Sequence, residues 1–250
     1  MKKLTLLVAC IFAGFTAHGA TVNWSAQVDT GFATSTNAAL TQGNFIRLGY
    51  FSFNALNTTA QNDAAVAALA APTVANVNTL DSNFVQFAQT QVGNAFGLDG
   101  FFQKGSTFSY LANPTFDFTK QIYIWVLKAN TNTNLGTALG SVTEQAIFYE
   151  PFVLGTSPNK AQWQFPLGDL LTSSPDIGDA KLSLGGVYLA GSYQASNAAL
   201  TAILTTANGG TATPSGAVKL QGVPEPSVVT LCALAALASA GVRRRSRLTL

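Results

Sequence analysis

The residue types that most often carry catalysis are confined to the two ends of this chain. Its one histidine, His18, and its two cysteines, Cys10 and Cys232, lie within or beside terminal apolar segments. Residues 21–222 therefore contain no side chain for a Ser-His-Asp triad, a Cys-His dyad, a histidine- or thiolate-bound metal, or a disulfide. We expect no cofactor and no catalytic residue of these classes in the central part of the chain.

Carboxylates are the remaining candidates for chemistry. Glu144 and Glu150 flank a strand-like run, but six residues along one strand span about 20 Å, whereas a retaining glycosidase holds its two carboxyl groups about 5 Å apart. We interpret both as solvent-exposed charges at strand ends. Asp169, Asp176 and Asp179 lie in a loop-rich stretch and could bind calcium through oxygen, but their spacing matches no calcium loop and aspartate is common in turns. We therefore predict no metal site and keep a carboxylate-only glycoside hydrolase as the least favoured alternative.

Flat aromatic side chains offer a different chemistry, because an exposed ring can stack on the face of a sugar. The central part contains three tryptophans, Trp24, Trp125 and Trp163. Trp163 is the best candidate for sugar stacking because it stands between two polar residues, Gln162 and Gln164. Aromatic rings in a β-rich domain more often belong to the core, and that alternative stays open.

Charge is sparse, which excludes one class of partner. Only 10% of residues are charged, against about 25% in an average domain. Residues 21–222 carry seven basic and ten acidic side chains, a net charge of −3, and no basic cluster. Nucleic-acid binding needs clustered Lys or Arg to displace phosphate counterions, so we expect no nucleic-acid partner. Solubility then depends on uncharged polar side chains.

The first 20 residues have the pattern of a secretory signal peptide. Lys2 and Lys3 precede the apolar run Leu4–Phe15, and small residues follow it. The run is too short to cross a bilayer, which takes about 20 residues, but it fits the apolar region of a signal peptide. Lipidation of Cys10 is a weaker alternative, because the apolar run continues past the cysteine. The sequence therefore predicts export across the inner membrane.

The last 28 residues, 223–250, contain three features in order. Pro224-Glu225-Pro226 comes first, the apolar run Val228–Val242 follows, and a basic cluster ends the segment: Arg243, Arg244, Arg245 and Arg247. Fifteen helical residues reach about 22 Å, short of the roughly 30 Å hydrocarbon core, and arginines at the end can extend the span by snorkelling. The basic cluster should stay cytoplasmic and act as the membrane stop, which leaves residues 21–222 outside.

This tail resembles the PEP-CTERM sorting signal of exported bacterial proteins. The resemblance implies that Pro224, Glu225 and Pro226 are recognition residues for an exosortase, a membrane-embedded enzyme that processes its substrates near this motif. It also implies transient anchoring in the inner membrane by the C-terminal helix, and final delivery to the cell surface or extracellular matrix of bacteria that make exopolysaccharide. An ordinary tail anchor with the same tripeptide is the alternative, and it would also leave the domain exported.

Residues 21–222 have the pattern of one β-rich domain. Short apolar runs separated by Gly, Asn and Pro predict strands at 22–28, 45–53, 107–111, 121–128, 144–149, 182–189 and 217–221. The run 121–128, rich in β-branched and aromatic residues, is expected to be a central strand. Two helices are predicted, one at 61–71 with Asn62 or Asp63 as its N-cap and one at 81–91. We predict a mainly β fold: a single jelly-roll-like β-sandwich with one or two short helices, plus the terminal signal and sorting helices.

Two functions from different classes follow. The first is a non-enzymatic surface or matrix protein, sorted by an exosortase, with a structural or adhesive role associated with exopolysaccharide. The alternative is a carbohydrate-binding module.

Overall fold

The computed structural model of the protein describes residues 19–26, 30–53, 58–109, 117, 119–131, 133–151, 163, 172–173, 185–211 and 214–222. The predicted signal peptide, apart from Gly19 and Ala20, and the whole predicted sorting tail at 223–250 lie outside the described residues.

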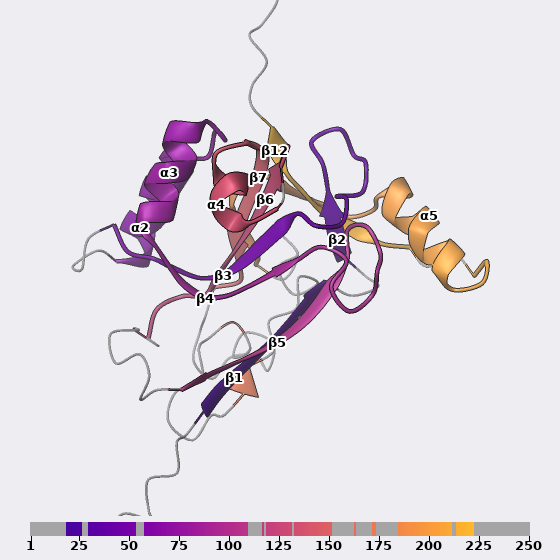
Figure 1. The fold of residues 1–250 in the computed structure, drawn as a ribbon, viewed down its shortest axis with the longest axis horizontal. Helices are drawn as coiled ribbons and strands as arrows, with labels where there is room; N and C mark the ends of the chain where they lie inside the picture. The colour runs from indigo at the N-terminus through magenta and orange to yellow at the C-terminus, as the bar shows by residue number, and fades with distance from the viewer. Residues whose placement is uncertain are drawn as a thin grey trace, which may run out of the picture.

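Strands dominate the described residues, which confirms the prediction of a mainly β domain (Figure 1). The strands are β1 (Gly19–Ala26), β2 (Thr30–Ala33), β3 (Phe45–Phe51), β4 (Phe84–Gln91), β5 (Phe102–Ser109), β6 (Tyr123–Ala129), β7 (Val142–Tyr149), β8 (Thr172–Ser173), β9 (Val187–Ala190), β10 (Ser192–Gln194), β11 (Gly216–Lys219) and β12 (Gln221–Gly222). The helices among the described residues are α2 (Thr59–Ala68), α3 (Val74–Ser82), α4 (Leu135–Leu139) and α5 (Ala198–Ala207). The fold is β-sandwich-like, with more helices than the one or two predicted.

A six-stranded antiparallel sheet forms the centre of the fold. β12, β7, β6, β3 and β4 are hydrogen-bonded in that order, and β9 also pairs with β7. β6 lies between β3 and β7, and every residue in it except Lys128 is buried. The prediction of a central strand is therefore confirmed, because side chains pointing to either face of β6 are covered.

Two three-stranded sheets accompany the large one. In the first, β1 pairs antiparallel with β5, from Gly19 opposite Ser109 to Ala26 opposite Phe102, and parallel with β8. In the second, β11 pairs antiparallel with β10 and parallel with β2. The ribbon of β1 and β5 lies below β3 and β4 in Figure 1, and α5 extends on the right beside β2. β4 and β5 contact each other, so the turn that joins them lies where two sheets meet.

Aromatic rings fill much of the core. Phe51 on β3 contacts the ring of Phe84 at a centroid distance of 4.9 Å and the edge of Tyr123 at 5.4 Å. Trp24 on β1 meets Phe102 on β5 edge to face at 5.1 Å. These tilted and edge-on arrangements are the ones that aromatic quadrupoles favour. Phe32 on β2 links the ribbon to the large sheet, because its ring lies 5.9 Å from that of Phe102 and 6.3 Å from that of Phe148.

One cation is buried within this aromatic core. The guanidinium of Arg47 on β3 lies 4.7 Å from the ring centre of Phe84 and 4.8 Å from that of Trp125. It also donates hydrogen bonds to Asp81 at 2.6 Å and to Gln86 at 2.7 Å. Burial lowers the pKa of Arg47, and the adjacent Asp81 carboxylate opposes that change. The charge is thus satisfied by a carboxylate, an amide and two ring faces.

The first predicted helix exists, but it begins earlier than expected. Thr58 is the N-cap of α2: its hydroxyl accepts a bond from the Gln61 amide, and the Gln61 side chain accepts one from the Thr58 amide. This reciprocal pair is a capping box. Asn62 and Asp63, the predicted caps, lie inside the helix, where Asn62 is buried and accepts a bond from the Phe53 amide at 3.2 Å.

The second predicted helix, at 81–91, is wrong. α3 occupies Val74–Ser82, Asn83 follows it as the C-cap, and β4 starts at Phe84. The spacing of Phe84, Phe87 and Ala88 suggested one face of a helix, but pairing with β3 overrides that pattern. Phe84 is buried by rings of the sheet rather than by helix neighbours.

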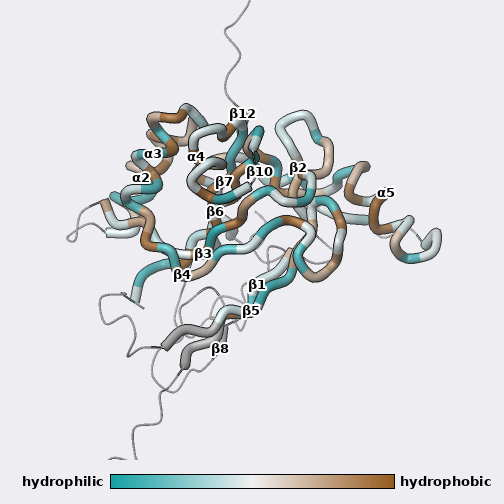
Figure 2. Tube along the Cα trace, in the orientation of Figure 1, coloured by the Kyte–Doolittle hydropathy of each residue, from teal (hydrophilic) through white to brown (hydrophobic). Residues whose placement is uncertain are grey.

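Helix α5 was not predicted. Asn197 caps it through a bond from the Leu200 amide at 3.1 Å, and Leu200 and Leu204 are buried on one side. Hydrophobic and hydrophilic residues both occur along this helix (Figure 2). Its large apolar residues are Leu200, Ile203 and Leu204, and its other residues are alanines and threonines, so the helical period is weak in the sequence.

Candidate functional site

A polar hollow lies where β3, β4, the 92–97 turn, β5 and α4 come together. Its volume is about 700 Å³, within the range of about 300–1,000 Å³ usual for ligand pockets. We call it the amide groove, because five of its lining side chains are carboxamides: Gln42, Gln89, Gln91, Asn94 and Asn134. Phe45, Thr90, Lys104, Thr133 and Leu135 also line it, together with the turn residues Gly43, Val92 and Gly93.

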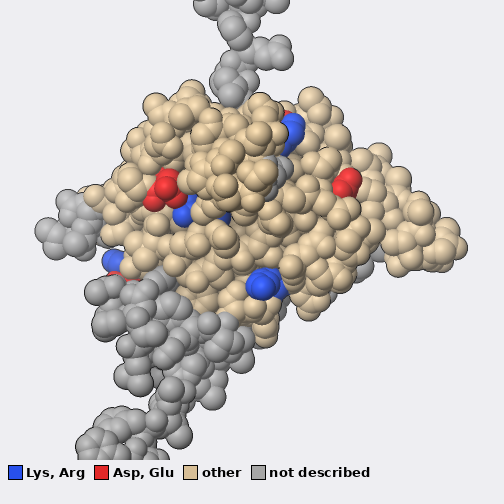
Figure 3. Space-filling view, in the orientation of Figure 1, with Lys and Arg blue, Asp and Glu red and all other residues tan. Residues whose placement is uncertain are grey.

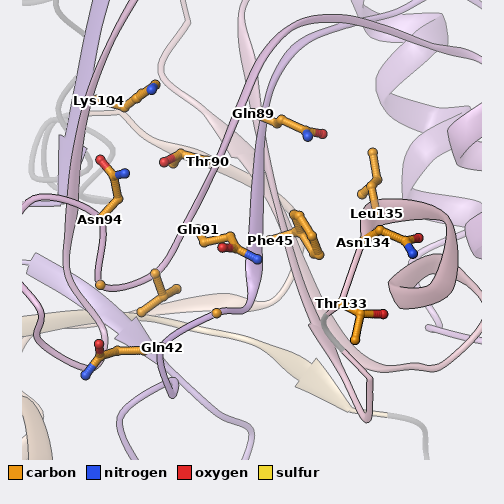
Figure 4. A pocket seen from close by; sticks show the side chains of 13 residues that line it. Gln42, Phe45, Gln89, Thr90, Gln91, Asn94, Lys104, Thr133, Asn134 and Leu135 are labelled. Atoms are coloured by element: carbon orange, nitrogen blue, oxygen red, sulfur yellow. The ribbon is translucent and has the colours of Figure 1, made fainter.

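The side chains of the amide groove come from opposite sides. In Figure 4, Lys104 and Asn94 lie on one side, Thr133, Asn134 and Leu135 lie on the other, and Gln89, Gln91 and Phe45 lie between them. The middle group belongs to β3 and β4, in which Phe45 is opposite Gln91. The sheet therefore forms the floor of the groove, while β5 and the start of α4 supply its walls.

Two tight turns shape one end of the groove. The Gly43 amide donates to the Val92 carbonyl at 3.0 Å, and the Gly93 amide donates to the Phe101 carbonyl at 2.7 Å. Gly93 has φ of +88°, where an L-residue is strained. A Cβ at this position would also lie 2.7 Å from Cγ of Gln42. Glycine is required here because it lets the Gln42 side chain lie against the turn.

Two of the carboxamides are held in place by the surrounding backbone. Gln42 donates from Nε2 to the Gly97 carbonyl at 3.1 Å, which leaves its side-chain oxygen for other donors. Asn134 is the N-cap of α4, and its side-chain oxygen accepts bonds from the Thr137 amide and hydroxyl at 2.9 and 3.0 Å. Its amino group has no acceptor among the described residues. Both side chains thus present one fixed hydrogen-bonding group.

Four other lining side chains keep their full hydrogen-bonding capacity. Gln91, Asn94, Thr133 and Lys104 make no side-chain hydrogen bond or ion pair with any described residue. Gln89 accepts only a long bond, at 3.4 Å, from Gln86. The amide groove therefore combines two oriented carboxamides with several side chains whose donors and acceptors are available to a ligand.

The chemistry of the lining favours binding over catalysis. A carboxamide donates and accepts hydrogen bonds without changing its charge, and Lys104 is the one titratable residue among those that line the groove. General acid–base catalysis needs titratable groups placed to exchange protons with a substrate. The groove is suited to hold uncharged polar groups in a defined orientation.

Trp163, the residue predicted to stack on a sugar, does not line the amide groove. Trp163 is fully buried, and its ring lies 6.1 Å from that of Phe148 on β7. Its indole N–H has no hydrogen-bond partner within the described part of the chain. The prediction that Trp163 offers an exposed ring to a sugar is therefore wrong, because the polar neighbours of a residue do not determine which way its own side chain points. Trp24 and Trp125 are buried as well.

The two glutamates expected at the surface are also buried. Glu144 on β7 forms an ion pair with Lys128 on β6 and accepts a bond from the Ser35 amide at 2.5 Å. Glu150 has only 2% of its surface exposed. The prediction of solvent-exposed strand-end charges is wrong, and for Glu144 the reason is that residues distant in the sequence cover it. With one carboxylate committed to Lys128 and Ser35, this pair offers no support for a glycosidase.

A carboxylate–tyrosine cluster joins helix α2 to the large sheet. Tyr123 and Tyr149 donate to the two carboxylate oxygens of Asp63 at 2.8 and 2.6 Å. Burial raises the pKa of both tyrosines far above the usual value, and the Asp63 charge adds to this effect. Both hydroxyls are neutral donors at any physiological pH, so the cluster ties α2 to β6 and β7 and has a structural role.

The predicted sorting residues, Pro224, Glu225, Pro226 and the arginines at 243, 244, 245 and 247, lie outside the described residues, as do Asp169, Asp176 and Asp179. No helix in the described ranges is long and apolar enough to cross a membrane. Within the same ranges, no group of three or more His, Cys, Asp or Glu side chains could hold a metal ion.

Sequence reasoning missed the amide groove, because its side chains come from four separate stretches of the chain. The one signal was the glycine-containing pair of turns at Gln42-Gly43 and Val92-Gly93. Comparison with protein-family models, with curated proteins and with solved structures gives no match for this chain.

Proposed function

We propose that this chain is an exported, non-enzymatic protein of the cell surface or extracellular matrix, with a structural or adhesive role associated with exopolysaccharide. The observation that carries the proposal is the ordered tail: Pro224-Glu225-Pro226, the apolar run Val228–Val242 and the basic cluster. An exosortase would recognise the tripeptide, and the apolar run would hold the protein in the inner membrane until processing. The structural or adhesive role would then belong to residues 21–222, the domain that the tail delivers.

Two properties of the domain support a role outside the cell. It uses uncharged polar side chains where most domains use charges, and charged residues on the face in Figure 3 are few and form no large patch of one sign. β12 ends at Gly222, immediately before the tail, and pairs with β7 in the large sheet. Residues 223–250 thus follow directly on an edge strand of the large sheet, so that a tether placed there would be joined to that sheet.

The test uses three forms of the full chain, followed by cell fractionation. Deletion of Val223–Leu250 should move the protein from the membrane and cell-surface fractions to the soluble exported fraction. Replacing Pro224, Glu225 and Pro226 by alanine should keep the protein at the inner membrane with its tail uncleaved, because the apolar span remains while the recognition residues are lost. Alanine at Gln221 and Lys219 is the matched control and should leave localisation unchanged.

Two results would contradict the proposal. Unchanged cell association after deletion of Val223–Leu250 would show that the tail does not sort the protein. Normal processing of the triple alanine variant would show that the tripeptide is not recognised, and would favour an ordinary tail anchor.

The carbohydrate-binding alternative is favoured by a different observation, the amide groove. This is independent of Trp163, whose burial removes the original reason for that alternative.

A further inference from the structure

We propose that the amide groove is a binding site for an uncharged, hydroxyl-rich polysaccharide segment. The inference rests on the proposed function, because a surface protein meets polysaccharide, but the site itself is argued from its side chains. Apart from Gly43, Val92 and Gly93, ten residues line it, of which five are carboxamides and two are threonines. The side chains present decide which classes of ligand the groove can bind.

Most other ligand classes need a lining that this groove lacks. Phosphate and nucleotide ligands require several cations or a nest of backbone amides, and Lys104 is the one cation in the lining. Apolar ligands require a predominantly apolar pocket, whereas the larger apolar side chains here are Phe45 and Leu135, the first of them buried. Cations prefer carboxylate oxygens, and no residue of the lining has one.

Sugar hydroxyls match the groups that remain. Each hydroxyl donates one hydrogen bond and accepts others, and a carboxamide offers a donor and an acceptor about as far apart as two adjacent hydroxyls. Gln91 and Asn94 have both of these groups free of described partners and face the groove from β4 and from the following turn. Thr133 and Lys104 add a hydroxyl and three donors from opposite walls (Figure 4).

Part of the site is organised before any ligand arrives. The bonds from Gln42 to Gly97 and from Thr137 to Asn134 fix one carboxamide at the turn and one on the α4 wall. A fixed group loses less conformational entropy on binding than a free one. We therefore assign orientation of the sugar to Gln42 and Asn134, and most of the adaptable contacts to Gln91 and Asn94.

The experiment is affinity electrophoresis of the full chain, purified in mild detergent, through gels cast with neutral polysaccharides. The probes are dextran, laminarin and galactomannan, and alginate serves as an anionic comparison. The double variant Gln91→Ala/Asn94→Ala removes two free carboxamides. The matched control is Asn23→Ala, which removes an exposed carboxamide from β1. Asn23 is opposite Gly105, one residue from Lys104, so it lies on the other face of the β1–β5 ribbon.

We expect at least one neutral polysaccharide to retard the wild-type chain and the Asn23→Ala variant equally. The double variant should bind about tenfold more weakly or worse, because two hydrogen-bonding groups are lost. Near-ultraviolet circular dichroism should be the same for all three proteins, since the changed side chains make no bond within the described fold.

Three results would overturn the inference. The first is no retardation by any of the neutral probes, and the second is equal retardation of the double variant and the wild type. The third is retardation by alginate alone that disappears in Lys104→Ala, because the site would then recognise an anion. None of these results changes where the protein is found in the cell, so failure of the groove assignment is distinguishable from failure of the sorting assignment.

Discussion

Replacing Gly93 by alanine is expected to destabilise the fold and distort the amide groove together. The backbone at Gly93 has φ of +88°, where an L-residue costs about 1–2 kcal/mol. The new Cβ would lie 2.7 Å from Cγ of Gln42, so the Gln42 side chain must move. Its hydrogen bond to the Gly97 carbonyl is then lost, which costs about 0.5–1.5 kcal/mol. The total expected loss in the free energy of unfolding is about 1.5–3.5 kcal/mol.

Gly97→Ala is the matched control for this prediction. Gly97 also has a positive φ, +63°, but a Cβ there would meet no atom within 4 Å. It should therefore lose only the backbone contribution of about 1–2 kcal/mol. The assay is urea unfolding of the full chain followed by tryptophan fluorescence, because all three tryptophans are buried.

The test compares the stability of the Gly93→Ala and Gly97→Ala variants. Gly93→Ala should have the lower urea midpoint, with the slope of the transition unchanged, and it should also reduce retardation in the polysaccharide gels. If Gly93→Ala is no less stable than Gly97→Ala, the Gln42 side chain is not held against the turn. The preorganisation assigned to Gln42 would then be refuted.

Three further predictions concern buried polar groups. Arg47→Ala should lower the free energy of unfolding by about 3–5 kcal/mol, because it opens a gap between two rings and removes the partner of Asp81. Arg47→Met keeps the volume of the side chain and should lower it less. Equal urea midpoints for the two variants would contradict this prediction. Asp63→Ala leaves two buried tyrosine hydroxyls without their acceptor and should lower the free energy of unfolding by about 2 kcal/mol. This corresponds to a decrease in Tm of about 4–8 °C, measured by thermal circular dichroism. A decrease no larger than that of a variant at an exposed site would refute the prediction. Burial raises the pKa of Tyr123 and Tyr149, so their contribution to stability is complete below the unfolded value of about 10 and is lost as the pH rises toward the folded pKa. Tyrosinate absorbance of these two rings should therefore appear together with alkaline unfolding. Titration of both rings near pH 10 while the protein stays folded would contradict this prediction.

Strands with two covered faces were the most predictable part of the fold. The run that became β6 contains Ile124, Trp125 and Val126 in succession, and this composition specifies a buried strand with little help from the rest of the chain. β4 was misread because an edge strand with Phe84, Phe87 and Ala88 has the same spacing as one face of a helix. The pairing with β3 decides its conformation, and pairing is a property of the folded chain.

Burial of polar residues was the least predictable part. Glu144 is buried because Lys128 lies beside it on the neighbouring strand and Ser35 reaches it from a loop more than a hundred residues away in the sequence. Trp163 is buried although both of its sequence neighbours are glutamines. In each case the partner is brought by tertiary structure, and a pattern within a few residues cannot include it.

The amide groove was missed for a related reason, which also determines what can establish its role. The carboxamides that line it are of the same type as those that keep this sparsely charged domain soluble, so composition alone does not distinguish the groove from the remaining surface. What distinguishes it is the convergence of Gln42, Gln91, Asn94 and Asn134 from separate elements on one hollow, with two of them fixed by backbone bonds. A glycan that merely adheres to polar surface would lose as much from Asn23→Ala as from any other lost carboxamide. A glycan bound in the groove would lose affinity only when the converging side chains are removed, and this contrast decides between adhesion by general polarity and recognition at a site.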